Sequence, residues 1–174
     1  EILIADVETG QPLGPGERGE VWVRGPQVMA GYLALPGATA ATIDRDGWLH
    51  TGDIGTVDES GYCRIVDRVK ELIKYKGYQI APAELESIIM SHPQVADVAV
   101  IPKDSGTADG EFPKAFVVRT PDSNLDGDAV MAHVAATVAP YKKVREVEFV
   151  DAIPKNPSGK ILRRELKAQE RAKP

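Results

Sequence analysis

The sequence changes its character near residues 67–70. Before this point it consists of short β-type runs, at residues 2–7, 20–24 and 62–66, separated by turn-forming stretches of glycine, proline and acidic residues. After it, apolar residues recur at helical as well as strand spacing. The sequence therefore predicts an α+β chain of two unequal parts, a small β-rich part followed by an α/β part.

The second part is predicted to contain a hairpin, a helix, two strands, a second helix, a third strand and a last helix. The corresponding segments are residues 72–75 and 79–81, a helix beginning at Pro82, residues 95–101, 114–119, 126–138, 144–150 and 161–173. The strands at 95–101 and 114–119 are expected to pair antiparallel. Glu146 and Glu148 alternate with apolar residues, which indicates one solvent-facing side of their strand. The last helix is densely charged, and we expect a solvated face there.

Composition limits the classes of partner. The chain has 174 residues, a net charge of -5, 43% hydrophobic and 27% charged residues, which is typical of a soluble globular protein. No apolar stretch reaches the roughly 20 residues of a membrane span, and the negative charge gives no reason to expect a nucleic acid partner. With Cys63 as the only cysteine, an intrachain disulfide is excluded, and no metal site is predicted. We expect a cytoplasmic protein, and the start at Glu1, within a β-type run, predicts a truncated sequence.

The first candidate site is the tripeptide at residues 51–53, which ends in Asp53. A carboxylate beside a glycine can accept hydrogen bonds from two vicinal hydroxyls, such as those of a ribose. The same tripeptide is common in ordinary turns, and on pattern alone the turn is the more frequent interpretation. Asp53 is therefore a candidate ribose ligand only if other motifs in the sequence also indicate a nucleotide site.

The second candidate site lies within residues 67–86. Arg68 has the reach and the donors to bind a ribose or a phosphate. Lys70, Lys74 and Lys76 alternate along a segment that is expected to be extended, so we expect them to form one strongly cationic face. An edge strand that lysines protect from aggregation has the same pattern, and this alternative stays open.

The third candidate site lies within residues 153–166, where two prolines and a Ser-Gly precede Lys160. A rigid loop of this kind presents one ammonium at a defined point, which suits the stabilisation of charge on a transferring phosphoryl or acyl oxygen. A solvated loop lysine is the alternative. The stretch is not the phosphate-cradling GxxxxGK[ST] loop, because the upstream glycine and the following Ser or Thr are missing.

In this order and spacing, the three motifs resemble the adenylate-forming superfamily of acyl-CoA synthetases, peptide-synthetase adenylation domains and luciferases. The resemblance runs along essentially the whole chain, and residues 73–84 are most similar to 4-coumarate–CoA ligases and the related luciferases. It implies that residues 1–66 are the β-rich end of a large AMP-binding domain. Residues 67–70 would then be a hinge, and residues 71–174 the small mobile C-terminal domain.

The resemblance implies a role for each motif in a two-step ligation. Asp53 would bind the ribose hydroxyls of AMP with the help of Arg68, and Lys70 would lie at the hinge. In the first step, Lys160 would offset the negative charge that develops as the carboxylic acid substrate attacks the α-phosphate of Mg²⁺-ATP. Pyrophosphate would leave, and an acyl-adenylate would remain.

In the second step the small domain would turn to present another face. Lys74 and Gln79 would be the catalytic residues of this face, and Lys76, Gly77 and Tyr78 would bind CoA while its thiol attacks the acyl carbonyl. The implied partners are the acid, ATP and CoA. The implied Mg²⁺ would be bound mainly by an N-terminal part that this sequence does not contain.

The superfamily's Ser/Thr/Gly-rich phosphate loop, its adenine site and its acyl pocket precede the positions matched here. We therefore expect the chain alone to be inactive. The parent enzyme is expected to act on 4-coumarate or a fatty acid, although no residue present selects the acid. Two alternatives stay open, a luciferase-like oxygenase that shares the adenylation step and a non-catalytic module that binds CoA or a partner. The sequence indicates no oligomeric state.

Overall fold

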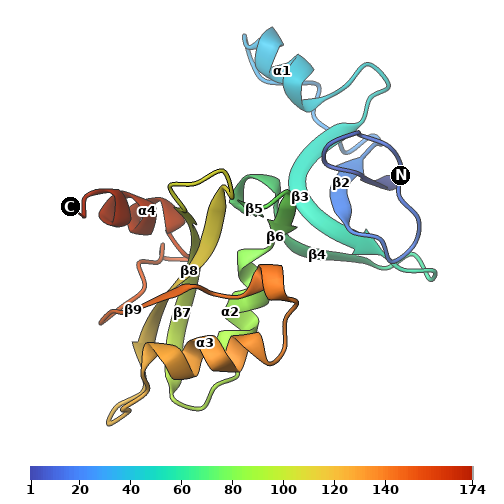
Figure 1. Cartoon of the computed structure of the whole chain (residues 1–174). Coiled ribbons are helices and arrows are strands. Elements are labelled where there is room, and N and C mark those ends of the chain that lie inside the picture. Colours follow the sequence, from blue (N-terminus) through green and yellow to red (C-terminus); the bar gives the residue numbers. More distant parts are fainter. Residues whose placement is uncertain (174) are drawn as a thin grey trace. The chain divides into compact units, whose positions relative to one another are not determined.

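The computed structural model describes residues 1–173 and divides the chain into two compact units (Figure 1). The first unit is Glu1–Lys70, and the second begins at Glu71. Each unit has its own β-sheet and its own buried core. The segment predicted as a hinge, residues 67–70, is the end of the first unit, and its mobility stays a prediction.

The first unit, residues 1–70, is built on an antiparallel sheet of four strands. These are β1 (Ile2–Ala5), β2 (Gly19–Val23), β3 (Leu49–Val57) and β4 (Cys63–Arg68), in the order β1-β2-β3-β4. Its small core includes Ile4, Val21 and Ile54. At Gly19 an added Cβ would lie 2.2 Å from the carbonyl oxygen of Ala5, so only glycine permits this close approach of the two chains.

Local patterns do not predict two elements of the first unit. The helix α1 (Pro36–Thr42) buries no residue, so it carries no apolar periodicity. The strand β3 contains Gly52 and Gly55, and glycine is depleted in strands. β3 depends on its pairing with β2 and β4 rather than on intrinsic preference.

Within residues 71–173, a hairpin and a three-stranded sheet form the second unit. The hairpin consists of β5 (Ile73–Tyr75) and β6 (Tyr78–Ile80), as predicted. The sheet consists of β7 (Val95–Asp104), β8 (Glu111–Arg119) and β9 (Glu146–Phe149) in that order. β7 and β8 pair antiparallel, which confirms the prediction, whereas β9 runs parallel to β8.

The helices of the second unit begin close to their predicted starts. They are α2 (Pro82–Met90), α3 (Gly127–Ala135) and α4 (Arg163–Arg171), and the short 3-10 helices η1 (Val69–Glu71) and η2 (Pro140–Lys142) lie in the connections. Pro82 fits the first turn of α2, and the Asp126 carboxylate caps α3 by accepting from the Ala129 N–H. In the part of the chain that the structure describes, no helix combines the length and apolar character needed to cross a bilayer.

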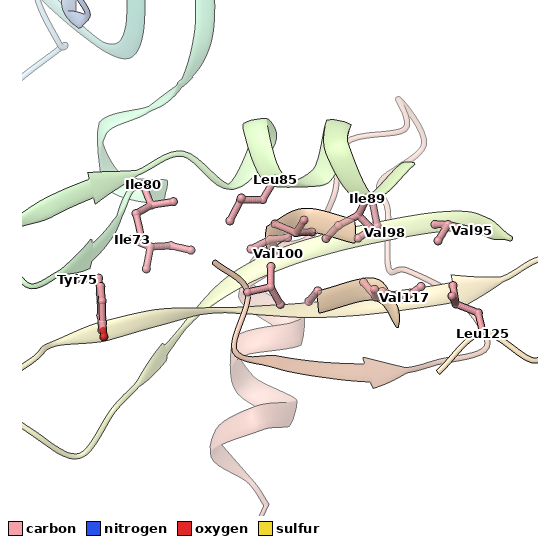
Figure 2. Packing of buried hydrophobic residues seen from close by; sticks show 14 residues of the cluster. Ile73, Tyr75, Ile80, Leu85, Ile89, Val95, Val98, Val100, Val117 and Leu125 are labelled. Atoms are coloured by element: carbon pink, nitrogen blue, oxygen red, sulfur yellow. The ribbon is translucent and has the colours of Figure 1, made fainter. Parts of the chain in front are cut away.

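Both faces of the β7–β8 pair are buried, against different helices. The first cluster includes Leu85, Ile89, Val98, Val100, Val117, Val130 and Val134 (Figure 2). The second cluster consists of Ala99, Ile101, Phe116, Ile153 and Leu166. Helices α2 and α3 contribute to the first cluster and α4 to the second. Because neighbouring strand residues point to opposite faces, the sheet lies between α2 and α3 on one side and α4 on the other.

A buried lysine faces the predicted solvent-facing side of β9. Lys114 on β8 is 1% exposed, and its Nζ lies 2.6–2.9 Å from carboxylate oxygens on β9 and α4. The surrounding Lys114 network consists of Lys103, Lys114, Glu146, Glu148, Glu170 and Lys173. The prediction for Glu146 and Glu148 holds in part, because 36% and 32% of these side chains remain exposed while their carboxylates face Lys114 and the charged groups of α4.

Mutual pairing keeps the network charged despite its burial. Burial by itself lowers the pKa of Lys114, but hydrogen bonds from its ammonium to three carboxylates outweigh that effect and hold the pKa well above its ordinary value. Burial raises the pKa of Glu170, but hydrogen bonds from three lysines outweigh it and lower the pKa of Glu170 to about 2. The network therefore remains ionised at neutral pH, and it fastens α4 to the sheet.

Replacing Lys114 by methionine should destabilise the second unit by about 1–3 kcal/mol, because Glu170, which is 11% exposed, loses one of its three cations and two partly exposed glutamates lose their buried partner. Lys155→Met is the matched control. It removes a more exposed pair with Asp97 and should cost less than about 1 kcal/mol. Urea unfolding, followed by the amide NMR signals of β7 and β8, measures both variants. Equal stabilities for the two would contradict the role assigned to the network.

Candidate functional site

Residues 51–53 form a bulge in β3. At this point three residues of β3 oppose the single residue Val21 of β2. Gly52 has a φ of +71°, which glycine adopts without strain, and the Thr51 hydroxyl donates to the Val21 carbonyl at 2.7 Å. Bulges are frequent next to functional sites, where they re-aim a side chain. The tripeptide that carries Asp53 is therefore part of a strand and not an ordinary turn.

Asp53 and Arg68 are neighbours on adjacent strands. They are partners in the register of β3 against β4, and Arg68 Nε lies 3.2 Å from Asp53 Oδ1. Both side chains reach solvent, with 32% of Asp53 and 47% of Arg68 exposed. The structure thus brings together the two residues that were predicted at a ribose. An accessible carboxylate oriented by a guanidinium has the geometry to accept hydrogen bonds from vicinal hydroxyls.

An aromatic pair beside the bulge escapes local sequence patterns. The rings of Trp22 and His50 stack, with centroids 3.9 Å apart and planes at 15°. Trp22 Nε1 donates to one oxygen of Glu20 at 2.9 Å, and the other oxygen accepts from the Gly52 N–H at 2.9 Å. These contacts hold the bulge in place. The ring stacking and the Gly52 contact join residues that are remote in sequence, so no spacing rule could have found them.

Lys74 and Gln79 lie directly opposite each other in the β5–β6 hairpin. Their neighbours Ile73 and Ile80 are fully buried, so Lys74 and Gln79 share the outer face of the hairpin. Lys74 is exposed and Gln79 is half-buried. The Lys74 N–H donates to Glu111 Oε2 at 3.3 Å, which attaches the hairpin to β8. Two residues predicted for the second reaction step are thus neighbours on a supported element.

Lys76 and Gly77 form the two-residue turn of this hairpin. Both have positive φ, +51° and +79°, as in the type I′ turn that matches the twist of paired strands. An added Cβ at Gly77 would meet no atom of the described chain within 4 Å, so the backbone there is open to a ligand. Lys76 Nζ lies 3.1 Å from Asp109, whose hydrogen bond raises the pKa of Lys76.

The predicted cationic face of Lys70, Lys74 and Lys76 is not formed. Lys70 belongs to η1, Lys74 to β5, and Lys76 to the turn with its left-handed backbone. Strand alternation places residues on one face only when they belong to the same strand. Lys74 is therefore the cation that the outer face of the hairpin presents, whereas Lys76 is paired with Asp109.

Tyr78 stacks on Tyr141, a residue outside the predicted motifs. The ring centroids are 4.1 Å apart and the planes meet at 16°. Tyr78 is 53% exposed, and Tyr141 belongs to η2. The pair forms a partly exposed aromatic surface next to the open turn at Gly77. Only the tertiary fold brings the two rings together, so the sequence carried no signal for Tyr141.

One side chain, Asn156, organises the loop that presents Lys160. Its Oδ1 accepts from the N–H groups of Ser158 and Lys160, at 3.1 and 2.8 Å, and from the Ser158 hydroxyl at 2.8 Å. The Asn156 N–H in turn donates to the Lys160 carbonyl at 3.0 Å. Lys160 itself is exposed, and among residues 1–173 its ammonium has no carboxylate partner. The loop is ordered while its cation remains available.

The predicted residues fall into separate groups in the two units. Asp53 and Arg68 belong to the first unit, whereas the hairpin residues and Lys160 belong to the second. Across the described residues, no three His, Cys, Asp or Glu side chains are grouped to hold a metal ion. A cavity of about 480 Å³ is lined by residues of β7 and α4, including Lys103 and Arg171, and none of the predicted site residues lines it.

Known protein families match two stretches of the chain. Residues 84–160 match the family described as AMP-binding enzyme C-terminal domain, and residues 1–33 match the family described as AMP-binding enzyme. The matched stretches fall in the second and the first unit respectively. The two-part division of the chain thus has a counterpart in the families that it resembles.

Curated relatives are much longer than the chain. It is 60% identical over 172 residues to "4-coumarate--CoA ligase-like 6" of Oryza sativa subsp. japonica, covering 99% of this chain and 29% of that protein. It is 54% identical over 166 residues to "Peroxisomal OPC-8:0-CoA ligase 1" of Arabidopsis thaliana, covering 95% and 30%. Among solved structures, ATP-bound MatB from Rhodopseudomonas palustris has a TM-score of 0.91 and 35% identity, with 99% of this chain and 34% of that chain covered.

Asn156→Ala should loosen the Lys160 loop and leave the rest of the second unit folded. The N–H groups of Ser158 and Lys160 lose their acceptor, so the Lys160 amide should exchange with solvent about tenfold faster. Asn124→Ala, at an exposed position before α3, is the matched control and should leave this amide unchanged. Hydrogen exchange read by NMR measures both. An unchanged Lys160 amide in Asn156→Ala would contradict the organising role of Asn156.

Proposed function

The chain belongs to the adenylate-forming superfamily of AMP-binding enzymes, and on this premise we propose that it is the C-terminal part of an ATP-dependent carboxylate–CoA ligase. The whole protein converts an acid, ATP and CoA into acyl-CoA, AMP and pyrophosphate through an acyl-adenylate. Relatives named for different acids are similar to it at 60% and 54% identity, and 4-coumarate or a fatty acid is the proposed substrate class. The cytoplasm is the proposed location.

The Lys160 loop carries this proposal. In the first step a carboxylate oxygen of the acid bonds to the α-phosphorus of ATP, the bond from that phosphorus to the bridging β-phosphate oxygen breaks, and pyrophosphate leaves. Lys160 offsets the negative charge that develops there. A cation that is already held in position stabilises such charge most effectively, because little reorganisation is needed during the reaction. The bonding of Asn156 to the loop supports this role.

The Asp53–Arg68 pair is proposed to hold the ribose of the adenylate. Asp53 accepts hydrogen bonds from the 2′ and 3′ hydroxyls, and Arg68 orients the carboxylate and adds a donor at the same sugar. The bulge at residues 51–53 supports the assignment, because it fixes the backbone at the carboxylate. Mg²⁺ accompanies ATP, and we assign no residue of this chain to it.

The hairpin is proposed to serve the second step, after the small domain has rotated about Lys70. The CoA sulfur bonds to the acyl carbonyl carbon, the bond from that carbon to the AMP oxygen breaks, and the thiol proton passes to solvent. Lys74 and Gln79 line the reacting thioester, and the turn of Lys76, Gly77 and Tyr78 contacts the pantetheine arm. The open backbone at Gly77 and the exposed Lys74 support this assignment.

Separate assays of the two steps test the proposal in the full-length protein. Lys160→Ala should lower ATP–pyrophosphate exchange by about 10²–10³-fold, because a charge aimed at the first transition state is lost. Lys74→Ala should keep the exchange and lose CoA-thioester formation. Both are measured over a panel of cinnamic and fatty acids, which also identifies the substrate class.

Arg164→Ala is the control for these variants, because Arg164 is an exposed cation of α4 near Lys160. It should behave as the wild type in both assays. A wild-type protein that exchanges no pyrophosphate with any acid would refute the ligase proposal and favour the non-catalytic module. Oxygen consumption that replaces thioester formation would favour the luciferase-like alternative.

The 174-residue chain by itself should form no acyl-CoA. It spans about 30% of its curated relatives and contains no Ser/Thr/Gly-rich phosphate loop, so it lacks the groups that would bind the triphosphate and the acid. The assay is thioester formation by the purified chain with the same acids, ATP and CoA, and the full-length enzyme is the positive control. Thioester formed by the chain, with contaminating ligases excluded, would contradict this expectation.

A further inference from the structure

Arg163 and Glu86 form a nearly buried ion pair between two of the motifs. Arg163 is the first residue of α4, and Glu86 lies in the middle of α2. Arg163 Nη2 donates to both carboxylate oxygens of Glu86 at 2.7 Å, and the two side chains are only 14% and 12% exposed. The solvated face predicted for the last helix is therefore wrong at its first residue. Charge-assisted hydrogen bonds of this kind are short and directional.

The Glu86–Arg163 pair lies along the β7 edge of the three-stranded sheet and hydrogen-bonds to it. β7 is an edge strand, with β8 on its other side. The Val100 N–H donates to Glu86 Oε1 at 2.8 Å, and the Val100 carbonyl accepts from Arg163 Nε at 3.3 Å. The pair thus satisfies both polar groups of one edge residue. Because α2 and α4 cover opposite faces of the sheet, it also links the two helical layers across this edge.

Each partner is close in sequence to a segment with a proposed catalytic role. On one side, the hairpin ends at Ile80, and α2 begins at Pro82. Ile80 and Leu85 lie in the same buried cluster, so the hairpin and α2 form one packed segment that leads to Glu86. On the other side, only two residues separate Lys160 from Arg163. The pair is thus a direct side-chain connection between the two segments.

The Lys160 loop has anchors at both ends, because the Leu162 N–H donates to the Pro154 carbonyl at 2.8 Å and Ile161 packs against the second cluster. Ile153 is buried, and Lys155 Nζ lies 2.6 Å from Asp97 on β7, with 36% of Lys155 exposed. Ion pairs with this degree of exposure contribute little to holding a segment in place. After Lys160, the first side chain that makes a hydrogen bond in the described chain is Arg163. These contacts hold the loop to itself and to the core, and Arg163 is the side chain that ties its end to α2.

We propose that the Glu86–Arg163 pair is a positioning device that sets the Lys160 loop relative to the hairpin, an inference that rests on the proposed function. Neither residue contacts a substrate in this role. Glu86 holds the Arg163 side chain in place, and Arg163 thereby holds the first turn of α4. The first turn of α4 in turn sets the position of Lys160, three residues earlier in the chain. A displacement of about 1 Å at a catalytic group can cost about a hundredfold in rate. The pair matters most for the first step, in which Lys160 acts.

The test compares Arg163→Gln with Arg164→Gln in the full-length enzyme, well below the unfolding temperature of each. Arg164 is the exposed neighbour on the same helix and serves as the matched control. Arg163→Gln should lower pyrophosphate exchange at saturating ATP by about tenfold to a hundredfold, with the KM for ATP within about twofold of wild type. Thioester formation from supplied acyl-adenylate and CoA should stay within about threefold, because it uses the hairpin.

Two further variants distinguish positioning from a general loss of structure. Arg163→Lys keeps a cation opposite Glu86, and its exchange rate should lie between those of wild type and Arg163→Gln. Glu86→Gln keeps an acceptor for the Val100 N–H but loses the charge, and it should slow the exchange as Arg163→Gln does. The double variant should be no slower than the slower single variant, because both substitutions remove the same interaction.

Equal loss of both steps in Arg163→Gln would overturn the inference, because it indicates a structural role alone. An exchange rate equal to that of Arg164→Gln would overturn it as well, and so would additive effects of the two substitutions. Failure of the proposed function is recognised separately. Wild-type enzyme that exchanges no pyrophosphate with any acid refutes the ligase assignment before a variant is compared.

Discussion

Burial of both faces of the β7–β8–β9 sheet is the constraint on which the second unit depends. Alternate strand residues must enter two different cores, so a charged side chain that is buried on these strands needs partners within the protein. Lys114 meets this need through carboxylates on β9 and α4. The same constraint leaves the free edge of β7 as the place where α2 and α4 can bond to each other, and Glu86 and Arg163 occupy it.

Local sequence patterns suffice where an element buries one side and exposes the other. The hairpin and α2 follow from the spacing of Ile73, Ile80 and Leu85, all of which are buried. The same reasoning is incomplete for β9. A glutamate in an alternating pattern predicts a solvent-facing side, but the pattern does not show that Lys114 on β8 pairs with Glu146 and Glu148 under α4. The reasoning fails for α1, which buries nothing and so leaves no periodic signal.

The residue types of the candidate site could be read from the sequence, but most of their supports could not. The pairing of Asp53 with Arg68 follows from the register of β3 against β4, which a bulge shifts. The contacts of Tyr78 with Tyr141 depend on elements far apart in the chain. The role of Asn156, in contrast, can be predicted locally. An asparagine in a loop commonly accepts hydrogen bonds from backbone N–H groups a few residues later in the chain, as Asn156 does. The sequence of the loop itself therefore carries the signal for Asn156.

The described chain pairs most of its lysines with carboxylates and leaves Lys70, Lys74, Lys143 and Lys160 without such a partner; of these, Lys74 and Lys160 are the two proposed catalytic cations. The paired ones include Lys76, Lys103, Lys114, Lys142, Lys155 and Lys173. A paired ammonium must lose its carboxylate before it can meet a ligand anion, whereas an exposed unpaired one loses only water. Such a lysine still needs a fixed position, and a neighbouring carboxylate would fix it only by neutralising it. Backbone and amide contacts avoid this conflict, because Asn156 orders the Lys160 loop without adding charge. Charge and position are thus supplied by different residues, which is the arrangement that electrostatic stabilisation of a transition state requires.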